Sequence, residues 1–328
     1  MNVELIAKLL DAPALPVYMR RVEEALHQLP EDISPTLRDP IKRILGANGK
    51  RLRPILLVSV VASQGKEIDE AVIAAASAIE LIHLASLIHD DIIDASDVRW
   101  GMPTISSREG VDTAVLVGDY LLAQAAVQAA SAGSGVASVV AETFATMCDG
   151  QSLELADTYN TSRSVDSYLK CINKKTAVLM AASCQIGGMC AGLSKSEVNA
   201  LSRYGEAFGM AFQLTDDLLD LLSTSEHIGK PIGNDIKEGV YTLPLLLGIK
   251  GASGDKIRNE LKQQSISQAT HLSPVEVLHQ DGSIDKTLAY IERYNQTARD
   301  ALSKLEDSSI VTGLQALPET YTTWALKT

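Results

Sequence analysis

Aromatic side chains are scarce in this chain of 328 residues, where 2 Trp, 3 Phe and 9 Tyr make up 4% of the sequence. Alternating strand-like patterns are also nearly absent, and helical periodicity dominates instead. Hydrophobic residues nonetheless reach 46%, with a mean hydropathy of +0.07, which excludes a disordered chain. A core that is large but poor in rings must be filled by small aliphatic side chains. We therefore expect an all-α protein whose helices pack closely together.

Cysteine pairs, targeting signals and long uncharged runs are missing as well. The first ten residues, MNVELIAKLL, have no basic region and no small-residue cleavage site, which argues against a signal peptide. No uncharged apolar run reaches the ~18 residues needed to span a bilayer. We expect a soluble, cytoplasmic protein. Without a CxxC pair, buried free thiols in a reducing compartment are expected at Cys148, Cys171, Cys184 and Cys190.

Positive charge is in deficit, because 29 Lys and Arg residues face 41 Asp and Glu residues, a net charge of −12. This balance argues against nucleic acid or an anionic membrane surface as the main partner. It still permits an anionic substrate, provided that basic residues gather locally or that a cation lies between the protein and the substrate.

Helix start signals divide the chain into long helices. Pro35 follows Ser34 at a first helical position, Pro54 is expected at another, and Ser194 with Glu197 forms a capping box. No repeat, low-complexity block or long linker interrupts the sequence. The predicted long helices cover residues 69–94, 111–131, 134–157, 164–191, 194–222 and 284–306.

Acidic residues cluster twice in the same pattern, D-D-x-x-D, at the end of predicted helices. The helix dipole disfavours carboxylates there, and neighbouring like charges repel by about 0.2–0.5 kcal/mol per pair. One such cluster is typical of a solvated helix end, but two matching clusters favour a shared cation. Mg²⁺ prefers carboxylate oxygens together with substrate phosphates. The six candidate ligands are Asp90, Asp91, Asp94, Asp216, Asp217 and Asp220.

Basic residues gather in two places. The segment GKRLRP puts Lys50 and Arg53 before a Pro-initiated helix, where free N–H groups already favour an anion; a solvated basic turn is an equal alternative. Lys175 and Thr176 interrupt an apolar helix, where a buried lysine needs an anionic partner. His83 shares a helix face with the first acidic cluster, and a satisfied core histidine is the alternative there. Carboxylates, a metal and phosphate-binding cations in an apolar bundle indicate a diphosphate with a hydrophobic tail.

The order of these motifs resembles that of the trans-isoprenyl diphosphate synthases, also called polyprenyl synthetases. The resemblance runs from about residue 46 to residue 246. It implies a single all-α domain over residues 1–328, a large helical bundle of the isoprenoid synthase type with a central substrate cavity. It also implies a homodimer, with a heteromer as the alternative. The segments that carry it are GKRLRP, IELIHLASLIHDDIID, VGDYLLAQA, KKTA, FQLTDDLLD and GKPIGNDIKEGVYTLP.

The resemblance also implies a role for each motif residue. Three Mg²⁺ ions would bridge the diphosphate of an allylic substrate to Asp90, Asp94 and Asp216, supported by Asp91, Asp217 and Asp220. The residues expected to hold this substrate and to act in catalysis are Arg99, Lys175, Thr176 and Gln213. Those expected to bind the diphosphate of isopentenyl diphosphate are Lys50, Arg53 and His83. A further substrate-binding candidate, in the segment GKPIGNDIKEG, is Lys230.

The basic residues of the family pattern are incomplete in this chain. The family usually has an arginine where Trp100 stands, a glycine at Asn48, and a lysine at both Asn234 and Val240. Tryptophan cannot replace the charged donor fork of arginine, because its single N–H is neutral. We expect the missing basic residues to affect turnover, substrate affinity or the identity of the second substrate rather than the fold.

The prediction is a Mg²⁺-dependent, chain-elongating prenyltransferase that condenses isopentenyl diphosphate with an allylic diphosphate. Ala85, Ser86 and further alanines precede the first cluster, so that a tail growing along this face meets no large side chain; this predicts an all-trans product of about C30 or longer. The alternatives are a short-chain farnesyl or geranylgeranyl diphosphate synthase, a terpene cyclase, and a weakly active or non-catalytic subunit of a heteromeric synthase. Membrane contact is expected to be peripheral at most, for product release.

Overall fold

The structure, a computed structural model, describes residues 1–328 except 31, 48, 223–233, 252, 268–276, 279 and 328. It is built mainly of helices, which confirms the all-α prediction. The α-helices are α1 (Val3–Leu9), α2 (Leu15–Leu26), α3 (Pro35–Leu45), α4 (Leu52–Ser63), α5 (Glu70–Ile93), α6 (Ile105–Glu109), α7 (Val111–Ala132), α8 (Ser134–Ala156), α9 (Val165–Ile172), α10 (Val178–Cys190), α11 (Lys195–Leu222), α13 (Asn234–Glu238), α14 (Leu243–Lys250), α15 (Gly254–Ser267), α17 (Ser283–Ala301) and α18 (Ser309–Lys327). The remaining elements are the π-helix η1 (Asn173–Ala177), the 3₁₀-helix η2 (Leu302–Lys304) and the strands β1 (Val98–Arg99) and β2 (Met102–Pro103).

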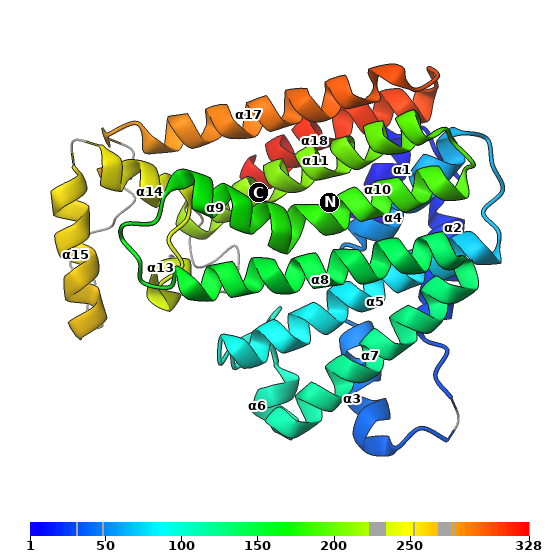
Figure 1. Ribbon diagram of the computed structural model, residues 1–328, viewed down its shortest axis with the longest axis horizontal. Coiled ribbons are helices and arrows are strands. Elements are labelled where there is room, and N and C mark those ends of the chain that lie inside the picture. The colour runs from blue at the N-terminus through cyan, green and yellow to red at the C-terminus, as the bar shows by residue number, and fades with distance from the viewer. Residues whose placement is uncertain are drawn as a thin grey trace.

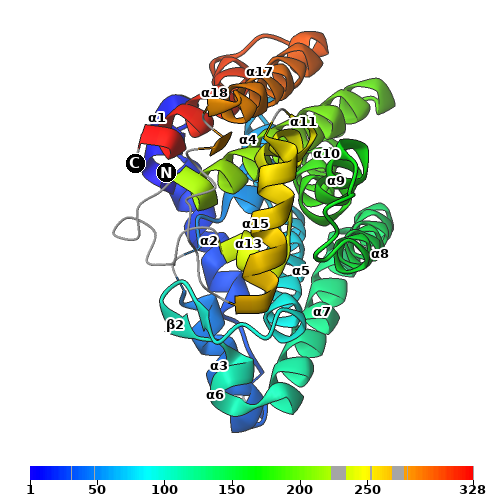
Figure 2. The ribbon, with the colours of Figure 1, turned by 90° about the vertical axis from the view of Figure 1, so that its left-hand side faces the viewer.

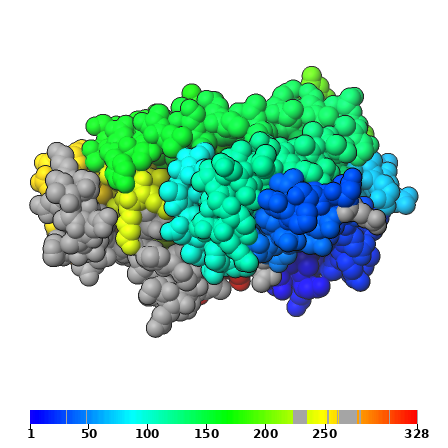
Figure 3. All heavy atoms as spheres, turned by 90° about the horizontal axis from the view of Figure 1, so that it is seen from below, coloured from blue at the N-terminus to red at the C-terminus, as the bar shows by residue number. Residues whose placement is uncertain are grey.

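Long helices run side by side along the longest dimension of the molecule (Figure 1). α5 packs mainly against α7, α10 packs against α11 and α4, and α11 also packs against α17. α15 lies across one end of the bundle (Figures 1 and 2), and the C-terminal ends of α5 and α11 both point toward that end. β1 and β2 pair antiparallel as a hairpin. Seen from below, this hairpin and α6 (cyan to teal) lie beside the N-terminal segment that includes α3 (blue; Figure 3). Both acidic clusters therefore lie toward the same end of the bundle.

Local signals predicted most boundaries of the long helices to within one or two residues. The capping box is present, because Ser194 N donates a hydrogen bond to Glu197 Oε2 at 2.9 Å and Glu197 N donates to Ser194 Oγ at 3.4 Å. The predicted helix 164–191 is interrupted by η1, and the last part of 284–306 is the 3₁₀ turn η2. Pro54 is the third residue of α4 rather than the first. A proline is tolerated there because first-turn N–H groups have no partner within the helix.

Glycines of α11 let this helix approach α10 and η1 at the level of the backbone. A Cβ atom at Gly205 would lie 2.3 Å from the carbonyl oxygen of Met180, and one at Gly209 would lie 2.5 Å from the Cα of Ala177. Any larger residue would push the helices apart. Because η1 directly precedes α10, this contact sets the last turns of α11 beside η1.

Five of the few aromatic residues form one cluster where α11 meets the C-terminal helix α18. The rings of Phe212 and Tyr321 stack with centroids 4.8 Å apart, and Phe208 meets Tyr321 edge-on at 6.1 Å. Tyr204 OH donates a hydrogen bond to the carbonyl oxygen of Leu314 at 2.8 Å. Trp324 completes the cluster, with its ring centre 6.0 Å from that of Tyr321. The cluster fixes α18 against the helix that carries the second acidic cluster.

Two helices of the described chain, α5 and α7, are long and apolar enough to cross a membrane by length and composition. In α5, 78% of the most apolar 18-residue stretch is buried inside the protein, as in the core helix of a globular domain. In α7 only 33% is buried, and its outer face exposes Val111, Val115, Leu116 and Val127. An apolar face of this kind is available to a partner surface.

Candidate active site

The first acidic cluster ends α5. Asp90 lies on the wall of a cavity between α5 and α8, and burial raises its pKa to about 6 against the opposing charge of Lys175. Asp94 is the C-cap residue of the helix and is exposed. Asp91 is buried and accepts a hydrogen bond from Arg99 Nε at 2.6 Å. Asp90 and Asp94 thus lie together, one turn apart, whereas Asp91 turns toward the hairpin.

The second acidic cluster lies in the last two turns of α11. Asp217 is buried and accepts hydrogen bonds from Tyr168 OH and from Gln213 Nε2, the latter at 2.9 Å. Burial raises the pKa of Asp217 to about 7 despite these hydrogen bonds, and it raises the pKa of Asp216 to about 6. Asp220 accepts a hydrogen bond from a backbone N–H of α13 at 3.3 Å. A cation at this site would stabilise the ionised form of these buried carboxyl groups.

The π-helix η1 connects the two clusters. Lys175 forms an ion pair with Glu154 of α8 and lies close enough to Asp90 for each charge to shift the pKa of the other group. Burial alone would lower the pKa of Lys175, but Glu154 and Asp90 raise it overall. The next residue, Thr176, donates a hydrogen bond at 2.8 Å to Gln213 Oε1, whose amide nitrogen reaches the second cluster. Two adjacent residues of η1 therefore serve both clusters. Lys175 places its ammonium group beside the first cluster, and the Thr176 hydroxyl is linked to the second through Gln213.

The form of η1 departs from an ordinary α-helical turn. Its five residues, NKKTA, make a single π-helical turn between α9 and α10, a feature that is rare and frequent at functional sites. Gly150 of α8 faces it so closely that a Cβ atom there would lie 2.5 Å from the backbone nitrogen of Lys175. α8 is consequently held directly against η1 at this point.

The basic motif reaches the second acidic cluster through one tyrosine. Lys50 Nζ donates a hydrogen bond to Tyr321 OH at 3.3 Å and lies 5.3 Å from the ring centres of Tyr321 and Trp324. Tyr321 OH in turn donates a hydrogen bond to Asp216 Oδ1 at 3.2 Å. Burial lowers the pKa of Arg53, and the nearby carboxylates, Asp216 among them, oppose this effect. The structure therefore brings Lys50 and Arg53 close to the second cluster.

Arg51, between these two cations in the sequence, points into the core instead. Its φ of 48° is left-handed, and its guanidinium group pairs with Glu80 at 2.9 Å and with Glu23 at 2.6 Å. His83 lies near this arginine. Burial and the charge of Arg53 hold the pKa of His83 well below its usual value, so that this imidazole is neutral at pH 7. Neutral His83 can donate one N–H to an anion but brings no charge.

Trp100 stands in the two-residue turn of the hairpin. Trp100 and Gly101 have φ values of 52° and 76°, the positive sign that a type I′ turn requires at both positions. The tryptophan side chain is 44% exposed and lines a hollow of about 100 Å³ together with Arg43, Arg99 and Arg108. Tryptophan thus replaces the arginine of the family pattern at a hollow that three other arginines line.

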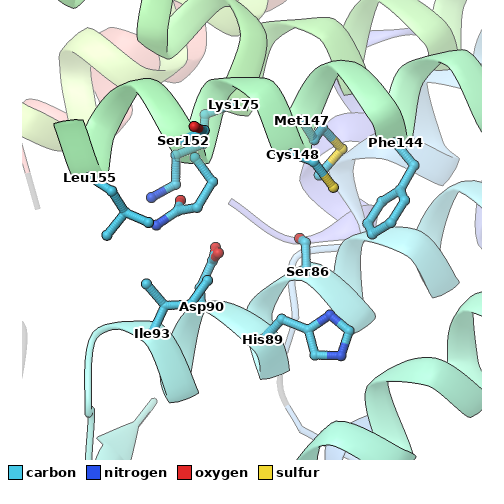
Figure 4. A pocket seen from close by; sticks show the side chains of 11 residues that line it. Ser86, His89, Asp90, Ile93, Phe144, Met147, Cys148, Ser152, Leu155 and Lys175 are labelled. Carbon is cyan, nitrogen blue, oxygen red and sulfur yellow. The ribbon is translucent and has the colours of Figure 1, made fainter.

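The cavity between α5 and α8 has a volume of about 300 Å³ and joins a polar end to an apolar one (Figure 4). Asp90 and Lys175 line its polar end. Toward the other end, Phe144 and Met147 of α8 lie across from Ser86 of α5. The size and shape of this space suit the first units of a hydrophobic chain attached to a charged head group.

The predicted path of such a chain along α5 differs from this cavity in two ways. Ala85 is fully buried between helices and is not part of the cavity wall, whereas Ser86 is. The prediction that a tail meets no large side chain is wrong here, because α8 contributes Phe144 and Met147. The sequence of α5 alone carries no information about the helix that packs opposite it.

The carboxylates fit a metal that binds together with its substrate. Among the described residues, no group of three or more His, Cys, Asp or Glu side chains is arranged to hold a metal ion by protein ligands alone. Mg²⁺ commonly binds through one or two carboxylates, several waters and substrate phosphates. The donor atoms of both clusters are oxygens, and burial raises the pKa of Asp90, Asp216 and Asp217. A divalent cation supplied with a diphosphate would satisfy these groups.

Four residues that the sequence analysis missed contact or support this site. Glu154 pairs with Lys175, Tyr168 and Tyr321 donate to the second cluster, and Gln151 lines the cavity. The sequence carries one usable signal for the α8 pair, since Gln151 and Glu154 are three residues apart in a helix that is otherwise rich in small apolar residues. Of the predicted residues, Lys230 lies outside the described part of the chain, as does Asn48.

Known proteins resemble this chain over most of its length. It is 34% identical over 309 residues to the nonaprenyl diphosphate synthase of Mycobacterium tuberculosis, which covers 93% of this chain and 91% of that one. It is also 34% identical to heptaprenyl diphosphate synthase component 2 of Geobacillus stearothermophilus, over 87% of this chain and 88% of that one. Short-chain isoprenyl diphosphate synthases are among the relatives too.

A solved structure shares the fold. The polyprenyl synthase from Caulobacter crescentus, complexed with calcium and isoprenyl diphosphate, superimposes with a TM-score of 0.85 at 28% identity and covers 98% of both chains. Residues 34–276 match the polyprenyl synthetase family, a range that contains both acidic clusters, η1 and the basic motif. With the helical bundle and these motifs in place, the chain belongs to the polyprenyl synthetase family.

Proposed function

We propose that this protein is a Mg²⁺-dependent, chain-elongating prenyltransferase that joins isopentenyl diphosphate to an allylic diphosphate. The observation that carries the proposal is the position of η1, whose Lys175 and Thr176 reach toward both acidic clusters at once. Membership of the polyprenyl synthetase family supports the same reaction.

The acidic clusters are the proposed metal site. Asp90 and Asp94 of α5 and Asp216 of α11 would hold three Mg²⁺ ions with the allylic diphosphate, supported by Asp91, Asp217 and Asp220. Their oxygen-only donor set and the burial that raises the pKa of Asp90 and Asp216 to about 6 support this assignment. When bound, Mg²⁺ supplies electrostatic stabilisation for the charge that develops on the diphosphate as the allylic C–O bond breaks.

Lys175, Thr176, Gln213 and Arg99 are the proposed ligands of the allylic diphosphate. Lys175 and Arg99 each pair with a carboxylate in this structure, so the diphosphate would share or displace those partners. The hydrogen bond from Thr176 to Gln213 holds both side chains in one orientation before substrate binds. This set therefore combines two donors that are already oriented with two cations that each have a carboxylate partner before substrate binds.

The bond changes follow from these positions. The allylic C–O bond breaks with its electron pair on the departing diphosphate, which Lys175 and Arg99 help to stabilise. The double bond of isopentenyl diphosphate supplies the pair for the new C–C bond, and a proton then passes from the adduct to the departed diphosphate. The apolar cavity wall keeps water from the cationic carbon atom.

Lys50, Arg53 and His83 are the proposed site for the diphosphate of isopentenyl diphosphate. Lys50 is held by Tyr321 and Trp324, and its contact to Tyr321 places it one side chain away from Asp216. His83 contributes a neutral N–H, since burial holds its pKa low. Lys230 stays a candidate for the same substrates.

A long product, about C30 or more, remains the leading proposal for chain length. The relatives named nonaprenyl and heptaprenyl diphosphate synthases support it, and a short-chain product is the alternative. Phe144 and Met147 narrow the cavity beyond Ser86, so a long chain must pass them or displace them. The second alternative is a weakly active or non-catalytic subunit of a heteromer. The relative named heptaprenyl diphosphate synthase component 2 supports this alternative, because its name implies another component.

We further propose that the chain acts as one domain, in the cytoplasm, and as a homodimer. The support for a dimer is the outer face of α7, which exposes Val111, Val115, Leu116 and Val127 although the helix is long and apolar. A second copy covering this face would remove that apolar surface from water.

Product analysis tests the proposed reaction. Purified protein with Mg²⁺, farnesyl diphosphate and labelled isopentenyl diphosphate should yield all-trans polyprenyl diphosphates, sized by chromatography after dephosphorylation. Asp90→Asn should lower the rate about a hundredfold or more, because it removes a charged metal ligand from the reacting end of the cavity. Asp166→Asn, at an exposed carboxylate on α9, is the matched control and should leave the rate unchanged. Absence of any extended product would favour the non-catalytic subunit, and cyclic products would favour a terpene cyclase.

Chain length should respond to Ser86, which lines the cavity opposite Phe144. Ser86→Phe is expected to shorten the product by one or more isoprene units, because the added ring blocks the path of the growing tail. Phe144→Ala should have the opposite effect. Ser303→Phe makes the same change at an exposed position in η2 and should not alter the product. An unchanged distribution in both cavity variants would mean that the tail takes another route.

Substitutions of Trp100 test whether the arginine missing at this position weakens the binding of isopentenyl diphosphate. Trp100→Arg should lower the KM for isopentenyl diphosphate at least several-fold, because one charge-assisted hydrogen bond contributes roughly 1.5–3 kcal/mol. The KM for the allylic primer should stay nearly the same. Trp100→Leu, which removes the ring without adding charge, separates the two effects and should not lower either KM. An unchanged or higher KM for isopentenyl diphosphate in Trp100→Arg would show that this position is not a missing phosphate ligand.

A further inference from the structure

Gln151 is an enclosed amide without a partner. Its side chain is 8% exposed, and neither Nε2 nor Oε1 has a hydrogen-bond partner among the described residues. Buried amides are nearly always hydrogen bonded, so one with both groups free in a cavity wall indicates a missing partner. Gln151 is one of the residues that line the cavity between α5 and α8.

The position of Gln151 along that cavity indicates which kind of group could form a hydrogen bond with its amide. Asp90 and Lys175 line the same space with it, and so do the apolar side chains of Ile93 and Leu155. Figure 4 shows Asp90 and Lys175 at the end where the polar groups gather, with Leu155 and Ile93 beside them. Gln151 directly follows Gly150, whose backbone packs on η1 beside Lys175, so it lies toward this polar end, where a charged head group would meet the start of a hydrophobic tail.

The backbone of α8 is fixed at this point. Gly150, the preceding residue, packs so closely on η1 that a Cβ atom would lie 2.5 Å from the nitrogen of Lys175. Glu154, one turn later on the same helix, forms the ion pair with Lys175. The backbone of Gln151 is thus held in register with the lysine by contacts of the residues on both sides of it.

We propose that Gln151 is a further substrate-binding residue, whose Nε2 amide donates a hydrogen bond to the diphosphate of the allylic substrate. The inference rests on the proposed function, since it assigns a ligand of that same site. An amide suits the position because it adds a donor without adding charge. A carboxylate there would stand beside Asp90 and Glu154 and repel the diphosphate, while an ammonium group would repel Lys175.

Binding of a non-ionising analogue tests this contact separately from the chemistry. With Mg²⁺ present, Gln151→Leu should weaken the binding of farnesyl thiolodiphosphate about ten- to hundredfold, the usual effect of losing a hydrogen bond to a charged group. Gln151→Glu should weaken it further. The KM for isopentenyl diphosphate should stay unchanged in Gln151→Leu. Calorimetry gives the analogue affinity, and steady-state rates give the KM.

A matched variant separates a ligand contact from a structural role. Asn295 on α17 is 2% exposed, and its Oδ1 likewise has no partner in the described structure, but it does not line the cavity. Gln151→Leu should leave the melting temperature unchanged or raised, because it removes a buried amide that has no partner. Asn295→Leu likewise removes a buried oxygen without a partner, but at a position outside the cavity. Only Gln151→Leu should lose analogue affinity. Analogue binding within twofold of the wild-type value in Gln151→Leu would overturn the inference, whereas a wild-type protein that forms no product and binds no analogue would instead refute the proposed function.

Discussion

Burial of like charges at the C-terminal ends of two helices is the constraint on which the rest of the structure depends. Asp90 ends α5, Asp216 and Asp217 lie near the end of α11, and burial raises the pKa of these three groups to about 6, 6 and 7. A carboxyl group whose pKa is higher in the folded than in the unfolded chain destabilises the fold as the pH rises through that interval. At neutral pH the clusters therefore cost stability, and a cation bound between them would recover it.

Close helix contacts make this arrangement possible. Gly205 lets α11 approach α10, while Gly209 and Gly150 let α11 and α8 approach η1, so that three helices meet around one turn. Lys175 and Thr176 of that turn then face different acidic clusters. A widening of any of these contacts would separate the cations from the carboxylates they serve. The small side chains of this protein thus matter for the site as well as for the core.

The sequence predicted the elements that follow from local rules. The helix boundaries, the capping box at Ser194 and the repeated acidic pattern depend on spacing and propensity, and these are visible in one chain. The π-helical turn at Lys175 depends on contacts with α8 and α11, which no local pattern encodes. α5 is apolar on nearly all sides, so its sequence does not tell which face lines the cavity, and of the predicted pair Ala85 and Ser86 only Ser86 is part of the cavity wall. Tyr321 was missed because it is about 270 residues away from the lysine it contacts.

Thermal unfolding with a bound diphosphate tests most directly whether a metal joins the two clusters. The melting temperature is measured with a prenyl bisphosphonate alone, with Mg²⁺ alone, and with both, because a ligand that binds the folded state raises it in proportion to its binding free energy. If a metal joins the clusters, either component alone should change the melting temperature little, and both together should raise it strongly. An equal rise with the bisphosphonate in the presence of EDTA would contradict it, because the carboxylates would then have no metal through which to hold the diphosphate.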